Sequence, residues 1–419
     1  MAPPRPFLWY TSHVIKGKKS VLRLSPAGTP VRLALVVVVV VAVGAAVVSV
    51  SGSARTGPIG PTSDLAALRL CGQSRPVQPV ARYRYAILQA WEYRQIRGIK
   101  RRSPGTKVLV YKDIASTRDD ARRAGLLPTG VGYAYANRRH PEWFLRDTQG
   151  RRVSWSDWPH AWQMDVGSRS YQQAWERNVA AELRRRGWDG VFLDNVAASM
   201  QYPSYLDGRV LARYPGPGDY QRATFRFLRN VGPGLRRQHV LVVGNINDAR
   251  TRVWSRWVSY LSGAAKEWWT KSAPGFGAGA LTGAAWKYQM RLLERAQARN
   301  KAFVAIAYGR VDDLAAMEYA RASFLLFARG SRSALTFSTG CGAEPSAPDW
   351  RQDLGVPTGG ASRVGVVWRR TFADGMAVVN PTAGQSVTLP LGGTYLDPSG
   401  APVTSVVLPP HSGLVLRRA

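Results

Sequence analysis

The chain has few cysteines, few histidines and few acidic residues for its 419 residues. Its two cysteines lack the paired Cys or His pattern of a zinc site, so we expect no metal and no cofactor. Neither a Walker phosphate loop nor a Gly-x-Ser-x-Gly elbow is present, which argues against nucleotide hydrolysis and against a serine esterase. Asp and Glu together number only 26. Acids at the ends of strands therefore stand out as candidates for chemistry.

Positive charge dominates, because 58 Lys and Arg give a formal net charge of +32. One interpretation is a polyanionic partner such as an acidic polysaccharide or a lipid surface. The other is compositional, because the arginines are scattered along the chain. No nucleic-acid-binding signature accompanies them, so we expect no nucleic-acid partner.

An apolar segment, residues 33–50, follows a basic tail, residues 1–32, that contains no Asp or Glu. Such a tail stays in the cytoplasm, so the rest of the chain would be exported. The segment fits either a single-pass transmembrane anchor or a signal peptide. Residues 51–64, rich in Gly, Ser and Pro, are typical of a linker. We expect an extracytoplasmic domain that is anchored in the cell membrane or secreted.

From residue 85 onward, short apolar runs alternate with longer segments of helical periodicity. This alternation is typical of parallel strands joined by helices, and eight strands favour a (β/α)₈ TIM barrel over residues 65–342. An open nucleotide-binding sheet would place a glycine fingerprint after its first strand, and none is present. The predicted strands are 85–89, 107–111, 162–166, 190–195, 240–245, 264–268, 303–308 and 334–338.

Cys71 precedes the first predicted strand and Cys341 follows the last. Closure of a barrel brings its first and last strands together, so a disulfide between these cysteines is a candidate in an oxidising space. Two separate free thiols are the alternative. Beyond them, residues 363–418 alternate short β runs with turns and predict a small all-β sandwich domain over 343–419. We favour a structural role for this domain, with sugar binding as the alternative.

A long stretch, residues 113–160, separates the second and third predicted strands, and loops of this length are usually functional. Within it, 131–136 and 143–153 resemble extended pieces, the latter a hairpin turning at 149–150. Sugar rings stack on aromatic planes, so the aromatic residues here predict a sugar platform, while any single ring could instead pack in the core. They are Tyr133, Tyr135, Trp143, Trp155, Trp158 and Trp162.

Two acids at strand ends are the candidate catalytic pair, because barrel active sites lie there and glycosidic cleavage needs two carboxyl groups. Asp194 follows three apolar residues of the fourth strand, and Glu267 precedes Trp268. We predict an ionised Asp194 as nucleophile and a protonated Glu267, against an apolar wall, as acid/base. The alternatives are that Asp194 caps a helix or pairs with an arginine, and that Glu267 pairs with Lys112.

Further candidates for substrate binding end the same strands. Lys112 would hold the charge of an acid or grip an anionic substrate, and Asp113 and Asp165 would either shape the site or cap the next helix. The full set is Trp91, Tyr111, Lys112, Asp113, Asp165, Asn195, Asn245, Trp268 and Tyr308.

Residues 188–196 (Trp-Asp-Gly-Val-Phe-Leu-Asp-Asn-Val) resemble the strand-four signature of barrel glycoside hydrolases. Three more pieces, 86–91 (Ala-Ile-Leu-Gln-Ala-Trp), 140–145 (His-Pro-Glu-Trp-Phe-Leu) and 164–166 (Met-Asp-Val), together with the tail 370–381, make the chain similar to the hypothetical glycoside-hydrolase-like family 15 over about residues 85–418.

The resemblance implies a barrel with a C-terminal β domain that hydrolyses glycosidic bonds, with the strand-four acid as nucleophile and a later-strand acid as proton donor. It implies a polysaccharide substrate without naming the sugar. A catalytically silent carbohydrate-binding barrel on the cell surface is the alternative from another class, and a transglycosylase that uses the same two acids is a third possibility.

Overall fold

The computed structural model describes residues 64–69, 83–121, 126–200, 206, 208–216, 218–247, 249–272, 278–339 and 350–419. All of them belong to one compact unit, Thr56–Ala419. The predicted membrane or signal segment, both cysteines and the predicted domain boundary at 342–343 lie outside the described residues. Within the described ranges, no helix combines the length and the apolar character needed to cross a bilayer.

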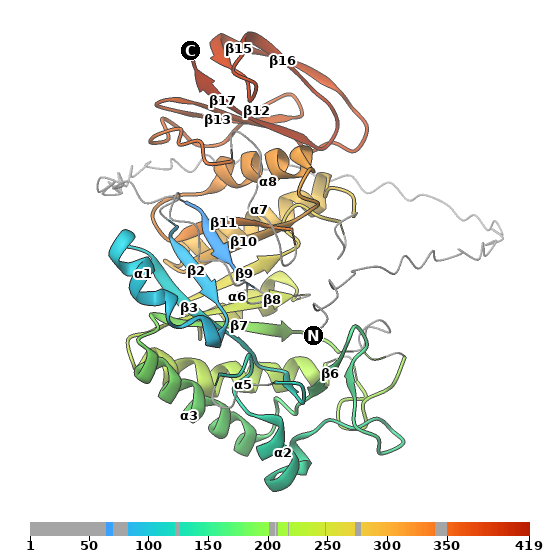
Figure 1. Ribbon diagram of the computed structural model, residues 1–419. Coiled ribbons are helices and arrows are strands. Elements are labelled where there is room, and N and C mark those ends of the chain that lie inside the picture. The colour runs from blue at the N-terminus through green and yellow to red at the C-terminus, as the bar shows by residue number, and fades with distance from the viewer. Residues whose placement is uncertain are drawn as a thin grey trace, which may run out of the picture. The chain divides into compact units, whose positions relative to one another are not determined.

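Eight parallel strands form the central sheet, and its two edges meet (Figure 1). Leu65 and Leu335 form a parallel bridge, and the Leu335 N–H donates to the carbonyl of Asp64 at 2.9 Å. The sheet is therefore a nearly closed barrel. Its strands, in order around the barrel, are β1 (Ala66–Leu68), β2 (Tyr85–Leu88), β3 (Lys107–Asp113), β7 (Gly190–Ala197), β8 (Leu241–Asn247), β9 (Gly263–Glu267), β10 (Ala302–Tyr308) and β11 (Ser333–Ser338).

Seven predicted strands match strands of this barrel, and the one at 162–166 is wrong. Residues 162 and 163 belong instead to β6 (Trp158–Gln163), in a separate antiparallel sheet of order β4-β6-β5. The barrel strand that the prediction missed is β1, which precedes the first predicted strand. The strand that carries Asp194 is still the fourth of the barrel, as predicted.

Side chains alternate between the two faces of each barrel strand, which divides the core in two. Leu109, Phe192 and Val304 point into the barrel and pack together there. Val108 and Val191, one position before Leu109 and Phe192, pack outward in the layer between strands and helices. The same alternation decides which residues at the strand ends reach the mouth of the barrel.

Helices cover the outer face of the barrel (Figure 1). Helix α3 begins after Ser168, whose hydroxyl accepts from the Tyr171 N–H, and it ends before Gly187, which has φ 72°. The helices are η1 (Ala90–Glu92), α1 (Gln95–Arg102), α3 (Arg169–Arg186), α5 (Asp219–Arg236), α6 (Thr251–Val258), α7 (Gly283–Ala298) and α8 (Leu314–Phe327).

An insert joins β3 to α3 and carries the small antiparallel sheet. The extended conformation predicted for 131–136 is wrong, because most of this stretch is helix α2. The predicted hairpin is confirmed, since Arg146 and Arg152 pair across a turn that contains Gly150. The elements of the insert are β4 (Ser116–Arg118), α2 (Tyr133–Arg139), η2 (Pro141–Trp143), β5 (Ser154–Trp155) and β6.

The C-terminal residues form one six-stranded antiparallel sheet, where the sequence predicted a sandwich of two sheets. Val367 of β13 and Leu408 of β16 share one core although their strands lie far apart in the sheet order, so the sheet folds over on itself. Helix α8 lies between it and the barrel (Figure 1), and Arg370 donates to the carbonyl of Leu325 at 2.9 Å. The strands are β12 (Ser362–Val364), β13 (Val367–Phe372), β14 (Gly375–Asn380), β15 (Val387–Leu396), β16 (Pro402–Leu408) and β17 (Ser412–Arg418).

Candidate active site

Two carboxylates at the C-terminal ends of barrel strands meet at one side-chain amide. Asp194 lies in β7, Glu267 ends β9, and Asn245 lies in β8 between them. The Asn245 Nδ2 donates to Asp194 Oδ1 at 2.9 Å and to Glu267 Oε2 at 3.0 Å. Because bonds of 2.9 Å and 3.0 Å end at the same nitrogen, these two oxygens lie within about 6 Å of each other. The structure thus brings the predicted pair together.

Two phenols donate to the remaining oxygens of the pair. The Tyr111 hydroxyl donates to Asp194 Oδ2, and the Tyr308 hydroxyl donates to Glu267 Oε1 at 2.7 Å. Burial raises the pKa of each phenol well above its usual value, and the charge of the adjacent carboxylate raises it further. Both phenols therefore keep their protons and act as donors to the acids.

The environment of Glu267 opposes its ionisation. Burial raises the pKa of the Glu267 carboxyl, and the charge of Asp194 raises it further. Hydrogen bonds from Tyr308 and Asn245 act in the opposite direction, but the net shift is upward. Asn247, which the sequence analysis did not select as a site residue, adds a donor to Oε2 at 3.3 Å. A carboxyl of this kind can hold a proton near neutral pH and release it during a reaction.

Aromatic residues border the pair. Trp268 has a left-handed backbone, φ 56°, and its ring lies on that of Tyr308 with centroids 4.3 Å apart. The tryptophan therefore packs on the phenol that holds Glu267. Trp91 is half-buried in η1, just beyond the C-terminal end of β2.

Asp113 is the third acid at this end of the barrel, and it lies opposite Asp194 in the β3–β7 pairing. Its Oδ1 accepts from the N–H of Ala115 at 2.7 Å, and its Oδ2 accepts from Asn195 Nδ2 at 2.8 Å. Burial and the charge of Asp194 raise the pKa of Asp113 to about 6. Asp113 thus orders the turn into strand β4 and also holds Asn195. The predicted cap of the next helix is wrong, because the segment that follows is a strand.

Asn195 reaches Asp113 because the strand is irregular there. The pairing of β7 with β8 shifts register between Leu193 and Val196, and Asn195 has φ 57°. Such a bulge re-aims the neighbouring side chains. Asn195 therefore contacts Asp113 and not the catalytic pair.

Lys112 lies on the other face of β3, and its predicted place at the mouth is wrong. Tyr111 and Asp113 point to the mouth, so alternation turns Lys112 toward the helices. Its Nζ is 2.7 Å from Oε2 of Glu182 on α3, and both side chains are buried. The predicted alternative pairing of Lys112 with Glu267 is therefore also excluded.

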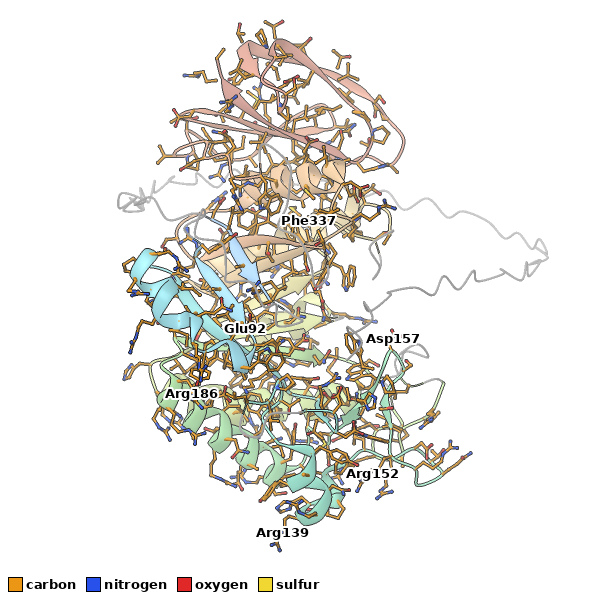
Figure 2. The ribbon with its side chains drawn as sticks, viewed as in Figure 1. Glu92, Arg139, Arg152, Asp157, Arg186 and Phe337 are labelled. Atoms are coloured by element: carbon orange, nitrogen blue, oxygen red, sulfur yellow. The ribbon has the colours of Figure 1, made fainter. Side chains whose placement is uncertain are left out.

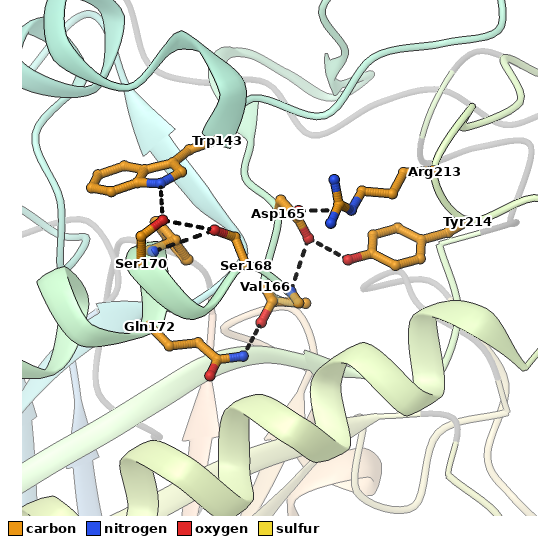
Figure 3. A network of polar contacts seen from close by, with 10 residues as sticks. Trp143, Asp165, Val166, Ser168, Ser170, Gln172, Arg213 and Tyr214 are labelled. Atoms are coloured by element: carbon orange, nitrogen blue, oxygen red, sulfur yellow. Dashed lines mark hydrogen bonds and ion pairs between the residues drawn. The ribbon is translucent and has the colours of Figure 1, made fainter.

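Asp165 belongs to a separate network between the insert and the loop that follows β7 (Figure 3). Its carboxylate accepts from the Tyr214 hydroxyl and from the Gly167 N–H, and it pairs with Arg213 Nε at 2.9 Å. Both carboxylate oxygens are therefore engaged within this network. The structure therefore does not join Asp165 to the Asp194–Glu267 pair.

The aromatic residues of the insert divide into two groups. Trp143 and Trp155 are 1% and 9% exposed and belong to the core, and Trp143 donates to Ser170 (Figure 3). Tyr133, Trp158 and Trp162 are only partly buried. The core interpretation thus holds for the first two rings, while the other three pack against the core and stay partly exposed. Tyr135, the sixth ring, is 46% exposed.

The sequence matches hypothetical glycosyl hydrolase family 15 over residues 100–376, which is more than half of the chain. The chain belongs to this family. The resemblance seen in the sequence is thereby confirmed, and the protein is a glycoside hydrolase by family. No functionally curated protein matches the sequence.

Solved structures with a distant likeness to the chain include several glycoside hydrolases. The glycoside hydrolase domain of PelA from Pseudomonas aeruginosa is 17% identical with a TM-score of 0.44, covering 67% of this chain and 96% of that one. Aspergillus fumigatus Ega3 in complex with galactosamine is 14% identical with a TM-score of 0.43, covering 67% and 92%. An Anoxybacillus α-amylase is 10% identical with a TM-score of 0.42, covering 80% and 87%.

Proposed function

We propose that the protein hydrolyses glycosidic bonds of an extracellular or cell-envelope polysaccharide with retention of configuration, using Asp194 as nucleophile and Glu267 as acid/base. The main support is that the side-chain amide of Asn245 donates hydrogen bonds to both carboxylates and so holds them close together. A separation of about 5–5.5 Å between the carboxyl groups is typical of retaining enzymes, whereas inverting enzymes leave about 6.5–9.5 Å for a water molecule. The upper bound of about 6 Å between the bonded oxygens, from bonds of 2.9 Å and 3.0 Å, favours retention.

The two acids have different environments, which assigns their roles. Asp194 accepts from Tyr111 and Asn245, and both donors stabilise a negative charge on it. Glu267 has a raised pKa because it is buried next to that charge. We therefore assign the attack on the anomeric carbon to Asp194, and the protonation of the leaving oxygen to Glu267.

The reaction would proceed in two steps. Asp194 Oδ attacks the anomeric carbon while Glu267 gives its proton to the leaving glycosidic oxygen, which yields a glycosyl ester and a free hydroxyl. The ester removes the charge that raised the pKa of Glu267, so this pKa falls and the carboxylate becomes a competent base. Glu267 then takes a proton from water, which attacks the anomeric carbon and restores Asp194.

The substrate is proposed as a polymer outside the cytoplasm because residues 33–50 are apolar and follow a basic tail. The net charge of +32 makes anionic polysaccharides one class to include in any screen.

A hydrolysis screen tests the proposal. Wild type and Asp194→Asn would be compared on neutral, acidic and amino-sugar polysaccharides, and the anomer released would be followed by NMR. Product of retained configuration from wild type alone is expected. Equal turnover by Asp194→Asn would remove Asp194 from the mechanism, and binding without cleavage by both proteins would favour the silent surface lectin.

A further inference from the structure

Strand β6 of the insert presents rings that one carboxylate holds in place. His160 and Trp162 are two residues apart, so their side chains leave the same face of the strand. The His160 Nδ1 lies 2.8 Å from Asp119 Oδ1, and the Trp162 Nε1 donates to Asp119 Oδ2 at 2.7 Å. The side chain of His160 is 59% exposed. Asp119 thus fixes the orientation of two rings at the surface.

Two more rings extend this surface. Tyr133 lies beside Trp162, with ring centroids 6.4 Å apart. Trp158 lies at the start of β6 with the guanidinium of Arg118 above it, 5.8 Å from the ring centroid. We call Tyr133, Trp158, His160 and Trp162 together the aromatic strip. Rings that are fixed in advance lose little conformational entropy when a ligand binds.

The simple alternative is that these rings belong to the core. The core side of β6 is already taken by Ala161 and Gln163, which are 4% and 0% exposed. His160 and Trp162 alternate with these two residues and therefore face the other way. Tyr133, Trp158 and Trp162 pack against the core but stay partly exposed, and the exposed carboxylate of Asp119 lies beside His160 and Trp162.

A short chain of contacts through β4 links the strip to the catalytic centre. Ser116 donates to Asp113, which faces Asp194, and Ser116 is also the first residue of β4. In the β4–β6 pairing, Thr117 lies opposite Trp162. From Trp162 back to Trp158, β6 leads away from the centre by about 3.3 Å per residue. The turn beyond Trp158 contains Asp157, at the outer edge of the molecule (Figure 2).

We propose that the aromatic strip binds consecutive sugar rings of a polysaccharide outside the reaction centre and leads the chain to the mouth of the barrel. The apolar C–H faces of sugar rings stack on aromatic planes, and the Asp119 carboxylate beside them accepts from hydroxyl groups. Only the ligand class, a sugar polymer, rests on the proposed function. The binding itself requires no turnover.

Affinity gel electrophoresis tests the strip with the full chain carrying Asp194→Asn, so that nothing is cleaved. The gels would contain soluble starch, hydroxyethyl cellulose, glycol chitosan or polygalacturonate. At least one polymer should retard the protein, and Trp162→Ala should weaken that binding by about three- to tenfold, the value of one aromatic stacking contact. Trp162→Phe keeps a ring and should retain most of the binding.

Matched variants keep the test decisive. His160→Ala changes an exposed side chain and should also weaken binding, even if Trp162→Ala disturbs folding. Tyr260→Ala removes a half-buried ring that packs on Phe225 just before β9, at the end of the barrel opposite the mouth, and should bind like the parent. The proposal is overturned if none of the four polymers retards the parent, or if His160→Ala and a folded Trp162→Ala both migrate like Tyr260→Ala.

Hydrolysis by the wild type on the same polymers separates this proposal from the catalytic one. Cleavage of a polymer that fails to retard the Asp194→Asn protein would remove the strip and leave the two-acid mechanism standing. If a polymer retards the Asp194→Asn protein, the strip variants abolish this retardation and the wild type does not cleave the polymer, the result would support sugar binding by the strip and count against the two-acid mechanism.

Discussion

The Tyr308 hydroxyl donates a hydrogen bond of 2.7 Å to Oε1 of Glu267, and this contact lowers the pKa of an acid that burial and Asp194 raise. Tyr308→Phe removes the donor, so the pKa of Glu267 should rise. The alkaline limb of kcat/KM, which reports the acid of the free enzyme, should therefore move to higher pH. The lost orientation of Glu267 should lower kcat/KM at the optimum by about tenfold.

Tyr319→Phe is the matched control for this change. Tyr319 is equally buried and donates to the carbonyl of Leu281, away from the acid pair. Its removal should leave the pH profile in place. An alkaline limb that moves to lower pH in Tyr308→Phe would contradict the assignment of Glu267 as the acid.

Asn245 should matter for rate more than for substrate affinity, because its amide is directed at the two carboxylates. Asn245→Ala frees both acids to rotate, and misplacement by about 1 Å can cost about a hundredfold in rate. We expect kcat to fall by about that factor with little change in KM. Asn230→Ala is the control, since the Asn230 amide on α5 donates a hydrogen bond to Gln172 on α3, away from the two acids. A raised KM with unchanged kcat would indicate a sugar-binding role.

Asp113 should make stability depend on pH. Its pKa is about 6 in the folded protein against an ordinary 3.8, so the folded state holds its proton more tightly than the unfolded chain. The resulting stabilisation is complete below about pH 4 and is lost as pH rises through 6. Relative to Asp113→Asn, the wild type should lose up to about 3 kcal/mol of unfolding free energy between pH 4 and 7, which urea titrations would measure.

The neutral variant also loses acceptors for Ser116 and Asn195, so only the pH dependence of the difference is diagnostic. Asp157→Asn, in the exposed hairpin turn, is a matched surface control. A constant difference between Asp113→Asn and wild type across this range would contradict the raised pKa.

The barrel strands could be predicted where both faces of the strand are buried. Residues 191–193 and 303–308 are continuous apolar runs, which is the pattern of a strand covered on both sides. Strand β1 has only three residues, too few to show any period, and its neighbour β2 and the Leu65–Leu335 bridge hold it in place. Residues 162–166 alternate apolar and polar side chains, a pattern that fits a strand of either kind. Their pairing partners, which a single segment does not reveal, decide between a barrel strand and an antiparallel one.

The site could be predicted as far as strand ends reveal it. Asp194 and Glu267 follow buried residues of their strands. Side chains alternate between the two faces of a strand, so a Tyr111 that points to the mouth already excludes its neighbour Lys112 from the mouth. The contact of Asn195 with Asp113 depends on a bulge, and no local sequence signal marks it. The Asp119–His160 contact joins residues that only the β4–β6 pairing brings together.

The Lys112–Glu182 pair should support the fold and not catalysis. Lys112→Met leaves the Glu182 carboxylate buried without its cation, which should lower the unfolding free energy by about 3–5 kcal/mol. The double variant Lys112→Met with Glu182→Leu should recover much of this loss. The kcat of the folded fraction should stay unchanged, because the ammonium lies on the helix side of β3. If Lys112→Met instead raised the KM for anionic substrates, Lys112 would have a role in substrate binding.

Azide rescue should separate the roles of the two acids. Asp194→Gly removes the nucleophile and leaves space for azide, which should attack an activated aryl glycoside directly and give a glycosyl azide of inverted configuration. Glu267→Ala still forms the ester on an activated substrate, and azide should open that ester to give the retained azide. NMR of the products assigns each configuration. If both variants gave the azide of the same configuration, azide would attack the same face of the sugar in both. Asp194 and Glu267 would then not have the separate roles of nucleophile and acid/base.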